Sequence, residues 1–180
     1  MKKIYQYAIL IFCIVLQMNV FAQGSAGKTW NSLARFAREE VLSYNIDFTN
    51  ALINGFEVDE FIATETNWAE GVKDMNTRFS TAFNREAFRG EFPHRVTLQN
   101  DKNYIINVKI QQINTSLYTK RKTWISVNIT ISDRKGNVLF SAYVEEKNGV
   151  FGTNLNLMGD ALEAVGYHLG RAFYTYAVEK

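Results

Sequence analysis

The chain has 180 residues, of which 47% are hydrophobic, and it contains one proline and one cysteine. This composition suits one globular domain with its own core and excludes extensive disorder. The formal net charge is +2, and removal of Lys2 and Lys3 would leave 18 of the 20 basic residues against 18 acidic ones. Without a basic excess, the chain is not expected to bind nucleic acid through its charge.

Residues 1–22 have the pattern of a Sec signal peptide. Two lysines near the start are followed by an apolar run over residues 9–16, and the small residue Ala22 ends the segment. This pattern predicts cleavage after Ala22 and export to the periplasm, the outer membrane or the exterior. The apolar run is shorter than the roughly 20 residues that span a bilayer. Residues 23–180 are then expected to form a single domain.

Cys13 raises the alternative of a lipidated lipoprotein. A lipidated cysteine follows a small residue, whereas Phe12 precedes this one. A retained membrane anchor is a second alternative, which Gln17 and Asn19 disfavour because they interrupt the apolar run. Cleavage after Ala22 would remove Cys13 and leave a mature chain without disulfides. Any membrane association is then expected to be peripheral.

The first half of the mature chain is predicted to contain helices and one strand. Apolar residues at helical spacing predict a short amphipathic helix over residues 30–38. Alternating apolar and polar residues predict a strand over 42–53, which the turn dipeptide Asn54-Gly55 ends. A short helix over 57–63 and a longer one over 67–88 follow, because apolar residues again recur three, four and seven positions apart.

The second half is predicted to be mostly strands followed by one helix. Alternation predicts strands over 95–99 and 104–116. The stretch 124–176 reads as a β-hairpin, with strands over 124–131 and 138–144, followed by an amphipathic helix. The hairpin needs its apolar face covered, and this helix is the nearest cover. The predicted fold is α+β, an antiparallel sheet of four to five strands with helices packed on one face and the last helix C-terminal.

A glycine-flanked turn precedes the last helix. It contains Gly149, Phe151, Gly152, Thr153 and Asn154. Free backbone N–H groups at a helix N-terminus can bind an anion. The alternative is that Thr153 or Asn154 caps the helix. We treat these residues as one part of a candidate interaction surface.

Three glycines in the last helix form the second part of that surface. Gly159, Gly166 and Gly170 lie at spacings of seven and four. Glycine inside a helix costs about 1 kcal/mol relative to alanine, so a compensating contact is expected. One interpretation is close packing on the sheet, with Phe140 or Tyr143 filling the space. The other is a helix–helix contact with a partner or a second copy.

A basic cluster, Lys120, Arg121 and Lys122, precedes the hairpin. On an exported protein it is a candidate site for anionic lipid headgroups or acidic glycans. The alternative is a solvated loop that protects neighbouring strand edges from pairing with other chains.

The sequence contains no recognised catalytic or metal-binding signature. Its two histidines, His94 and His168, form no H-E-x-x-H pair, and a zinc site would lack cysteine ligands. His168 is expected on the surface of the last helix. Paired carboxylates could act as acid and base only across a cleft, and a solvated face is the simpler interpretation. These pairs are Asp59 with Glu60, Glu145 with Glu146, and Asp160 with Glu163. No cofactor is expected.

Two segments resemble a family of short uncharacterised secreted proteins of Gram-negative bacteria. They are DFTNALINGFEVDEFIATETNW, residues 47–68, and NGVFGTNLNLMGDALEAVGYHLG, residues 148–170. The hairpin with its helix is also similar to small α/β outer-membrane lipoproteins of unknown function. The resemblance implies an α+β fold and an envelope location, and it implies no reaction.

The sequence therefore favours a non-enzymatic, exported envelope protein that acts as a binding or assembly module. Its expected partner is an envelope protein or a glycan. One alternative is a hydrolase of envelope polymers that uses paired carboxylates. Another is a structural subunit of an envelope complex.

Overall fold

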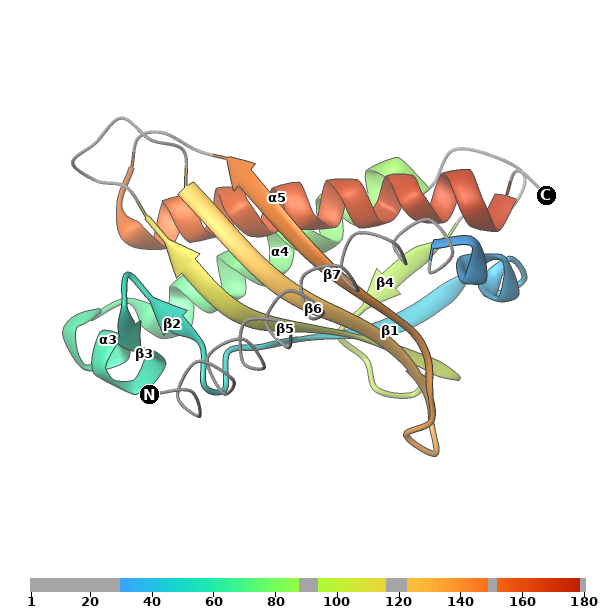
Figure 1. Ribbon diagram of the computed structural model, residues 1–180, viewed down its shortest axis with the longest axis horizontal. Helices are drawn as coiled ribbons and strands as arrows, with labels where there is room; N and C mark the ends of the chain where they lie inside the picture. Colours follow the sequence, from blue (N-terminus) through green and yellow to red (C-terminus); the bar gives the residue numbers. More distant parts are fainter. Residues whose placement is uncertain (1–29, 88–93, 116–122, 149–151, 179–180) are drawn as a thin grey trace, which may run out of the picture.

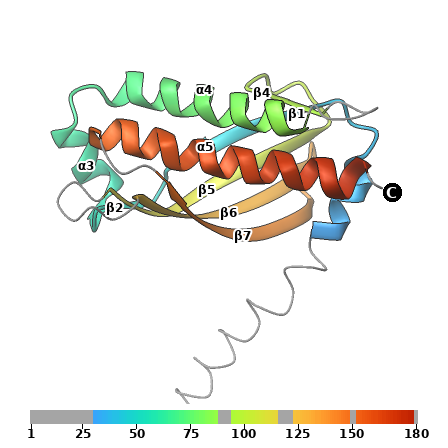
Figure 2. The same ribbon diagram turned by 90° about the horizontal axis from the view of Figure 1, so that it is seen from above.

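The described part of the chain forms a single mixed β-sheet with two long helices packed side by side on one face (Figure 1). The helices are α4 (Trp68–Ala87) and α5 (Asn154–Phe173), and both lie on the same side of the sheet (Figure 2). No described helix is both long and apolar enough to cross a membrane. The computed structural model describes residues 30–87, 94–115, 123–148 and 152–178.

Three long strands form the antiparallel meander that the alternation predicts. They are β5 (Tyr104–Asn114), β6 (Thr123–Asp133) and β7 (Val138–Asn148). The turn between β6 and β7 is held by Asp133, whose carboxylate accepts hydrogen bonds from two backbone N–H groups of the turn, each at 2.9 Å. Gly136 in this turn has a φ of +83°, as a hairpin turn with glycine requires.

The predicted purely antiparallel sheet of four to five strands is wrong. Within the described residues the sheet has seven strands, and β1 (Val41–Asp47) pairs in parallel with both β5 and β4 (Arg95–Thr97). Helix α4 lies between β1 and these partners in the sequence. A helical crossover returns the chain to the same end of the sheet, which makes the strands parallel. Alternation of side chains indicates a strand without giving its direction.

The predicted strand over 42–53 is broken in two. After β1, the carboxylate of Asp47 accepts a hydrogen bond from the backbone N–H of Thr49 at 2.8 Å, and Asn50 has a φ of +62°. Both features belong to a turn, because an Asp side chain that bonds two residues ahead bends the chain and Asn tolerates a left-handed conformation. The strand resumes as β2 (Leu52–Ile53).

A second tight turn follows β2, as the Asn-Gly pair predicts. Asn54 and Gly55 have φ values of +55° and +88°, and the chain returns as β3 (Phe56–Glu57). Positive φ at both central residues is the geometry of a two-residue hairpin. Helix α3 (Val58–Thr64) begins directly after β3 and confirms the short predicted helix.

The core lies between the sheet and the two long helices. Helix α4 contributes the apolar stripe predicted from its spacing, of which Met75, Phe79 and Phe83 are fully buried. The predicted helix at residues 30–38 forms as η1 (Asn31–Phe36), a 3₁₀ helix that closes one end of the core. A short π-helical segment, η2 (Tyr174–Val178), follows α5 beside it.

His94 is fully buried at this end of the core. Its Nδ1 donates a hydrogen bond to the Glu39 carbonyl oxygen at 2.7 Å, and its ring lies 5.5 Å from that of Phe173. No described residue is a partner for Nε2. Burial lowers the pKa of His94 below its ordinary value of 6.5, and the Glu39 carbonyl and carboxylate only partly oppose this. The folded protein therefore favours the neutral imidazole.

We expect acidification to destabilise the fold through His94. The unfolded chain takes up a proton near pH 6.5, whereas the folded chain does so only at a lower pH. The neutral His94 contributes fully to stability above about pH 6.5. This contribution is lost as the pH falls from there toward the lower pKa of the folded chain. The His94→Asn variant, which keeps a donor and cannot become charged, should lose less stability between about pH 7.5 and about pH 5.5. Urea unfolding at both pH values measures this, and an unchanged pH dependence would refute it.

Candidate functional site

A hollow between β7 and α5 is the strongest candidate for a functional site. Its volume is about 270 Å³, and it lies toward the C-terminal end of α5, beside the start of η1. Apolar side chains from the sheet and the helix form most of its walls. The lining residues are Trp30, Ile129, Val144, Glu146, Val165, His168, Leu169, Ala172 and Tyr176.

Glu146 is the exceptional residue of this lining. It lies on the face of β7 that also presents Phe140, Ala142 and Val144 to the helices, because alternate residues of a strand share a face. Its partner in the register of β6 is the fully buried Ile125. The Glu146 side chain is 18% exposed, and burial raises its pKa above the ordinary value. A carboxyl group thus occupies a position where the pattern of the strand would place an apolar residue.

His168 faces Glu146 from α5. Its Nε2 lies 3.4 Å from Glu146 Oε2, and the charge of His168 lowers the Glu146 pKa, against the larger effect of burial. The ring of Tyr167 lies edge-to-face against the imidazole at 5.1 Å. The surface position predicted for His168 is confirmed, since 54% of its side chain is exposed. A carboxyl group with a perturbed pKa that lines a hollow is a candidate for function.

The interpretation of Glu145 and Glu146 as a solvated pair is wrong for Glu146. Glu145 is exposed on the opposite face of β7 and accepts a hydrogen bond from Tyr143 at 2.7 Å. The predicted strand stopped at Val144, whereas β7 continues to Asn148. Extending the alternation by one step would have placed Glu146 inward. Glu146 and His168 belong to different elements, and no sequence pattern here indicated that they meet.

A second, polar hollow continues the first. Its volume is also about 270 Å³, and it shares Glu146 and His168 with the apolar hollow. Its other lining residues are Arg85, Lys147, Asn148, Glu163, Ala164 and Tyr167. The two hollows together form what we call the β7–α5 groove. Glu146 and His168 mark the boundary between its apolar and polar halves.

The glycine stripe of α5 packs against α4, and the predicted packing on the sheet is wrong. A Cβ on Gly166 would overlap the Phe79 carbonyl oxygen, and one on Gly170 would lie 2.5 Å from the Phe83 carbonyl oxygen. These glycines let the two backbones approach closely. Gly159, Gly166 and Gly170 are buried within this chain. In this fold they do not form a surface open to a partner.

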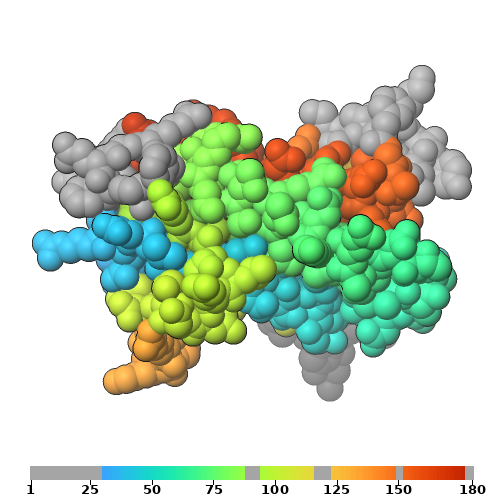
Figure 3. Space-filling view, turned by 180° about the vertical axis from the view of Figure 1, so that it is seen from behind, coloured from blue at the N-terminus to red at the C-terminus, as the bar shows by residue number. Residues whose placement is uncertain are grey.

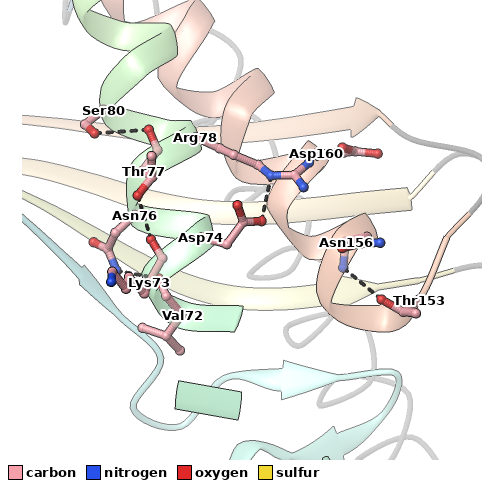
Figure 4. Close-up of polar contacts among 10 residues, drawn as sticks. All are labelled: Val72, Lys73, Asp74, Asn76, Thr77, Arg78, Ser80, Thr153, Asn156 and Asp160. Atoms are coloured by element: carbon pink, nitrogen blue, oxygen red, sulfur yellow. Dashed lines mark hydrogen bonds and ion pairs between the residues drawn. The ribbon is translucent and has the colours of Figure 1, made fainter. Parts of the chain in front are cut away.

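Arg78 of α4 connects the same two helices (Figure 4), and its side chain lies against Gly159 of α5. Its Nε lies 2.7 Å from the Asp74 carboxylate, and its Nη1 lies 2.7 Å from the Asp160 carboxylate. Asp160 therefore pairs with a cation of α4. This ion pair links α4 and α5 at a position where the glycine leaves room for the arginine side chain.

The turn before α5 is described only in part. Thr153 caps the helix, as predicted, by accepting a hydrogen bond from the Asn156 backbone N–H. Asn154 accepts a hydrogen bond from the Thr115 hydroxyl at 2.6 Å, which ties the start of α5 to the end of β5. Gly152 has a φ of +143°. Binding of an anion at this turn stays a prediction.

The remaining predicted site residues lie outside the described residues. These are Gly149 and Phe151 of the turn and the basic cluster Lys120, Arg121 and Lys122. Within the described ranges, no three His, Cys, Asp or Glu side chains are grouped so that they could hold a metal ion.

Comparisons with known proteins identify no family for the chain. No family model and no curated protein matches it. A variant of the PelC dodecamer from Paraburkholderia phytofirmans is 9% identical with a TM-score of 0.42, covering 80% of this chain and 90% of that one. Another PelC dodecamer from the same organism is 9% identical with a TM-score of 0.41, covering 72% and 88%. Protein XCC0632 from Xanthomonas campestris is 14% identical with a TM-score of 0.35, covering 48% and 54%. At these identities and TM-scores, no conclusion about the function of this chain rests on them.

Proposed function

We propose that the protein is an exported envelope binding module that takes up an amphipathic ligand in the β7–α5 groove. The observation that supports this most is the division of the groove into an apolar and a polar half at Glu146 and His168. Ligand sites are typically concave and mostly apolar, with a few polar groups that orient the ligand. The apolar part of the ligand would contact Val144 and Leu169, and its polar head would reach Lys147 and Asn148. Export is proposed from the signal-like segment at residues 1–22.

A single change in the apolar half tests this proposal. Ala172 lines the hollow and is half-buried, so Ala172→Leu would fill space without replacing a core residue. We expect this variant to lose at least about tenfold in affinity for the fluorescent fatty acid cis-parinaric acid, measured by titration. Ala69→Leu makes the same change on the exposed face of α4 and should bind as the parent does. Equal binding by both variants, or no binding by the parent protein, would refute the proposal.

A hydrolase of envelope polymers is the second candidate. It is favoured by the presence of Glu146, Glu163 and His168 around the polar hollow, where a carboxyl group with a raised pKa could donate a proton. The binding proposal predicts that purified protein releases no fragments from peptidoglycan. Fragment release that Glu146→Gln abolishes would replace binding with hydrolysis as the function of this groove.

A further inference from the structure

A separate hollow lies at the other end of the fold. Its volume is about 360 Å³, and it shares no lining residue with the β7–α5 groove. The segment from β2 to α3, turquoise in Figure 3, forms this end of the molecule beside the start of α4. We call it the Trp68 hollow. Its lining residues are Phe48, Thr49, Asn50, Glu57, Val58, Asp59, Ile62, Trp68 and Val72.

The aromatic side chains of Phe48 and Trp68 form one wall of the Trp68 hollow. The Trp68 ring lies edge-to-face against Phe48 at 5.2 Å and against Phe61 at 6.0 Å. The turn held by Asp47 and Thr49 places Phe48 in this position. Because two aromatic rings pack against the indole, its orientation is fixed. An indole face attracts a cation that comes within about 6 Å of its centre.

The rim of the hollow is acidic. Glu57 and Asp59 line it, both are exposed, and neither has an ion-pair partner within the described part of the chain. Residues 57–70 contain five acidic residues and no lysine or arginine, and Glu57 and Asp59 are two of these five. The segment that supplies this rim is therefore acidic, although the mature chain is expected to be neutral. Such a surface favours a positively charged partner.

The sheet edge at the hollow favours an extended peptide over a small amine. Strand β3 stands at the end of the strand order and, among the described residues, pairs only with β2. Within the described residues, the outer edge of this two-residue strand has no strand partner, and pairing with an added strand would begin there. Glu57 belongs both to β3 and to the lining of the hollow. A peptide paired with β3 would therefore place its side chains next to the acidic rim of the hollow.

We propose that this end of the protein binds an extended basic segment of a partner protein. One lysine or arginine side chain of the segment occupies the Trp68 hollow, between the indole and the carboxylates of Glu57 and Asp59. The backbone of the segment lies along β3, and the surrounding negative charge attracts its further basic residues. This site is independent of the ligand proposed for the β7–α5 groove.

Fluorescence anisotropy with a labelled peptide of alternating arginine and threonine residues tests the proposal. We expect saturable binding, and we expect the double variant Glu57→Gln/Asp59→Asn to lose at least about tenfold in affinity. The control Asp101→Asn/Glu145→Gln removes the same charge from exposed positions elsewhere and should change affinity less than about twofold. Trp68→Phe keeps a ring against Phe48 and should lose about threefold, because phenylalanine attracts cations less strongly than tryptophan.

Two further probes separate the peptide from other cations. A peptide with backbone N-methyl groups on alternate residues keeps its charge and cannot pair with β3, so we expect it to bind at least about tenfold more weakly. Spermidine carries amines without a peptide backbone and should compete only in large excess. Equal losses in the two double variants would indicate diffuse attraction and overturn the proposal. Equal binding of the methylated peptide, equally effective competition by spermidine, or no peptide binding would also overturn it.

Discussion

Replacing Gly166 with alanine is expected to lower the free energy of unfolding by about 2–3 kcal/mol, although alanine favours helix formation over glycine. The added Cβ would overlap the carbonyl oxygen of Phe79, which belongs to the backbone of α4. A backbone atom cannot rotate away as a side chain can, so the helices must separate. Their separation would disturb contacts along the α4–α5 interface. Urea unfolding followed by circular dichroism measures this change.

Gly159→Ala is the matched control for this prediction. Here the three atoms nearest to the added Cβ belong to the Arg78 side chain, with Cδ at 3.0 Å, and this flexible chain can adjust. We expect a change within about 1 kcal/mol in either direction, because the gain in helix propensity and the disturbance of the arginine oppose each other. If Gly166→Ala is as stable as Gly159→Ala, close backbone packing is not the reason for the glycines.

Replacing Phe173 with alanine is expected to destabilise the protein by about 3–5 kcal/mol. Phe173 is fully buried, and its ring lies 5.2 Å from Phe83 of α4 and 6.3 Å from Phe36 of η1. It also contacts His94. Truncation would leave a cavity where η1, α4 and the segment before β4 meet α5. The loss is a large share of the 5–15 kcal/mol that typically stabilises a domain.

Two variants make this measurement interpretable. Phe56→Ala removes the same atoms from a side chain that is 57% exposed, so its effect should stay within about 0.5 kcal/mol. Phe173→Leu keeps most of the volume and should fold with a smaller loss, below that of Phe173→Ala. Similar effects of Phe173→Ala and Phe56→Ala would show that the aromatic cluster at this end is not a main source of stability.

Most elements could be predicted because their patterns are local. The stripe of α4 follows from apolar residues three and four apart, and α4 runs within one residue of the predicted bounds. The β6–β7 hairpin follows from alternation around Asp133 and Gly136. The cap of α5 follows from Thr153. Each of these features depends on residues that are near neighbours in the chain.

The direction of β1 could not be predicted because it depends on a distant partner. Alternation shows that β1 is half-buried, whereas pairing with β4 and β5 makes it parallel. The glycines of α5 show the same limit. Their spacing indicated a close contact, but the contacting surface is the backbone of α4, more than 80 residues earlier.

The sequence by itself determined the elements, the turns and the α+β class of this protein, because propensity and periodicity act over a few residues. Only the tertiary structure decided what the elements bring together. It turned Glu146 inward and placed His168 of α5 beside it, and it set Trp68 next to the acidic residues that follow β2. These candidate sites join residues whose distance depends on how helices and sheet pack, and no local pattern encodes that distance.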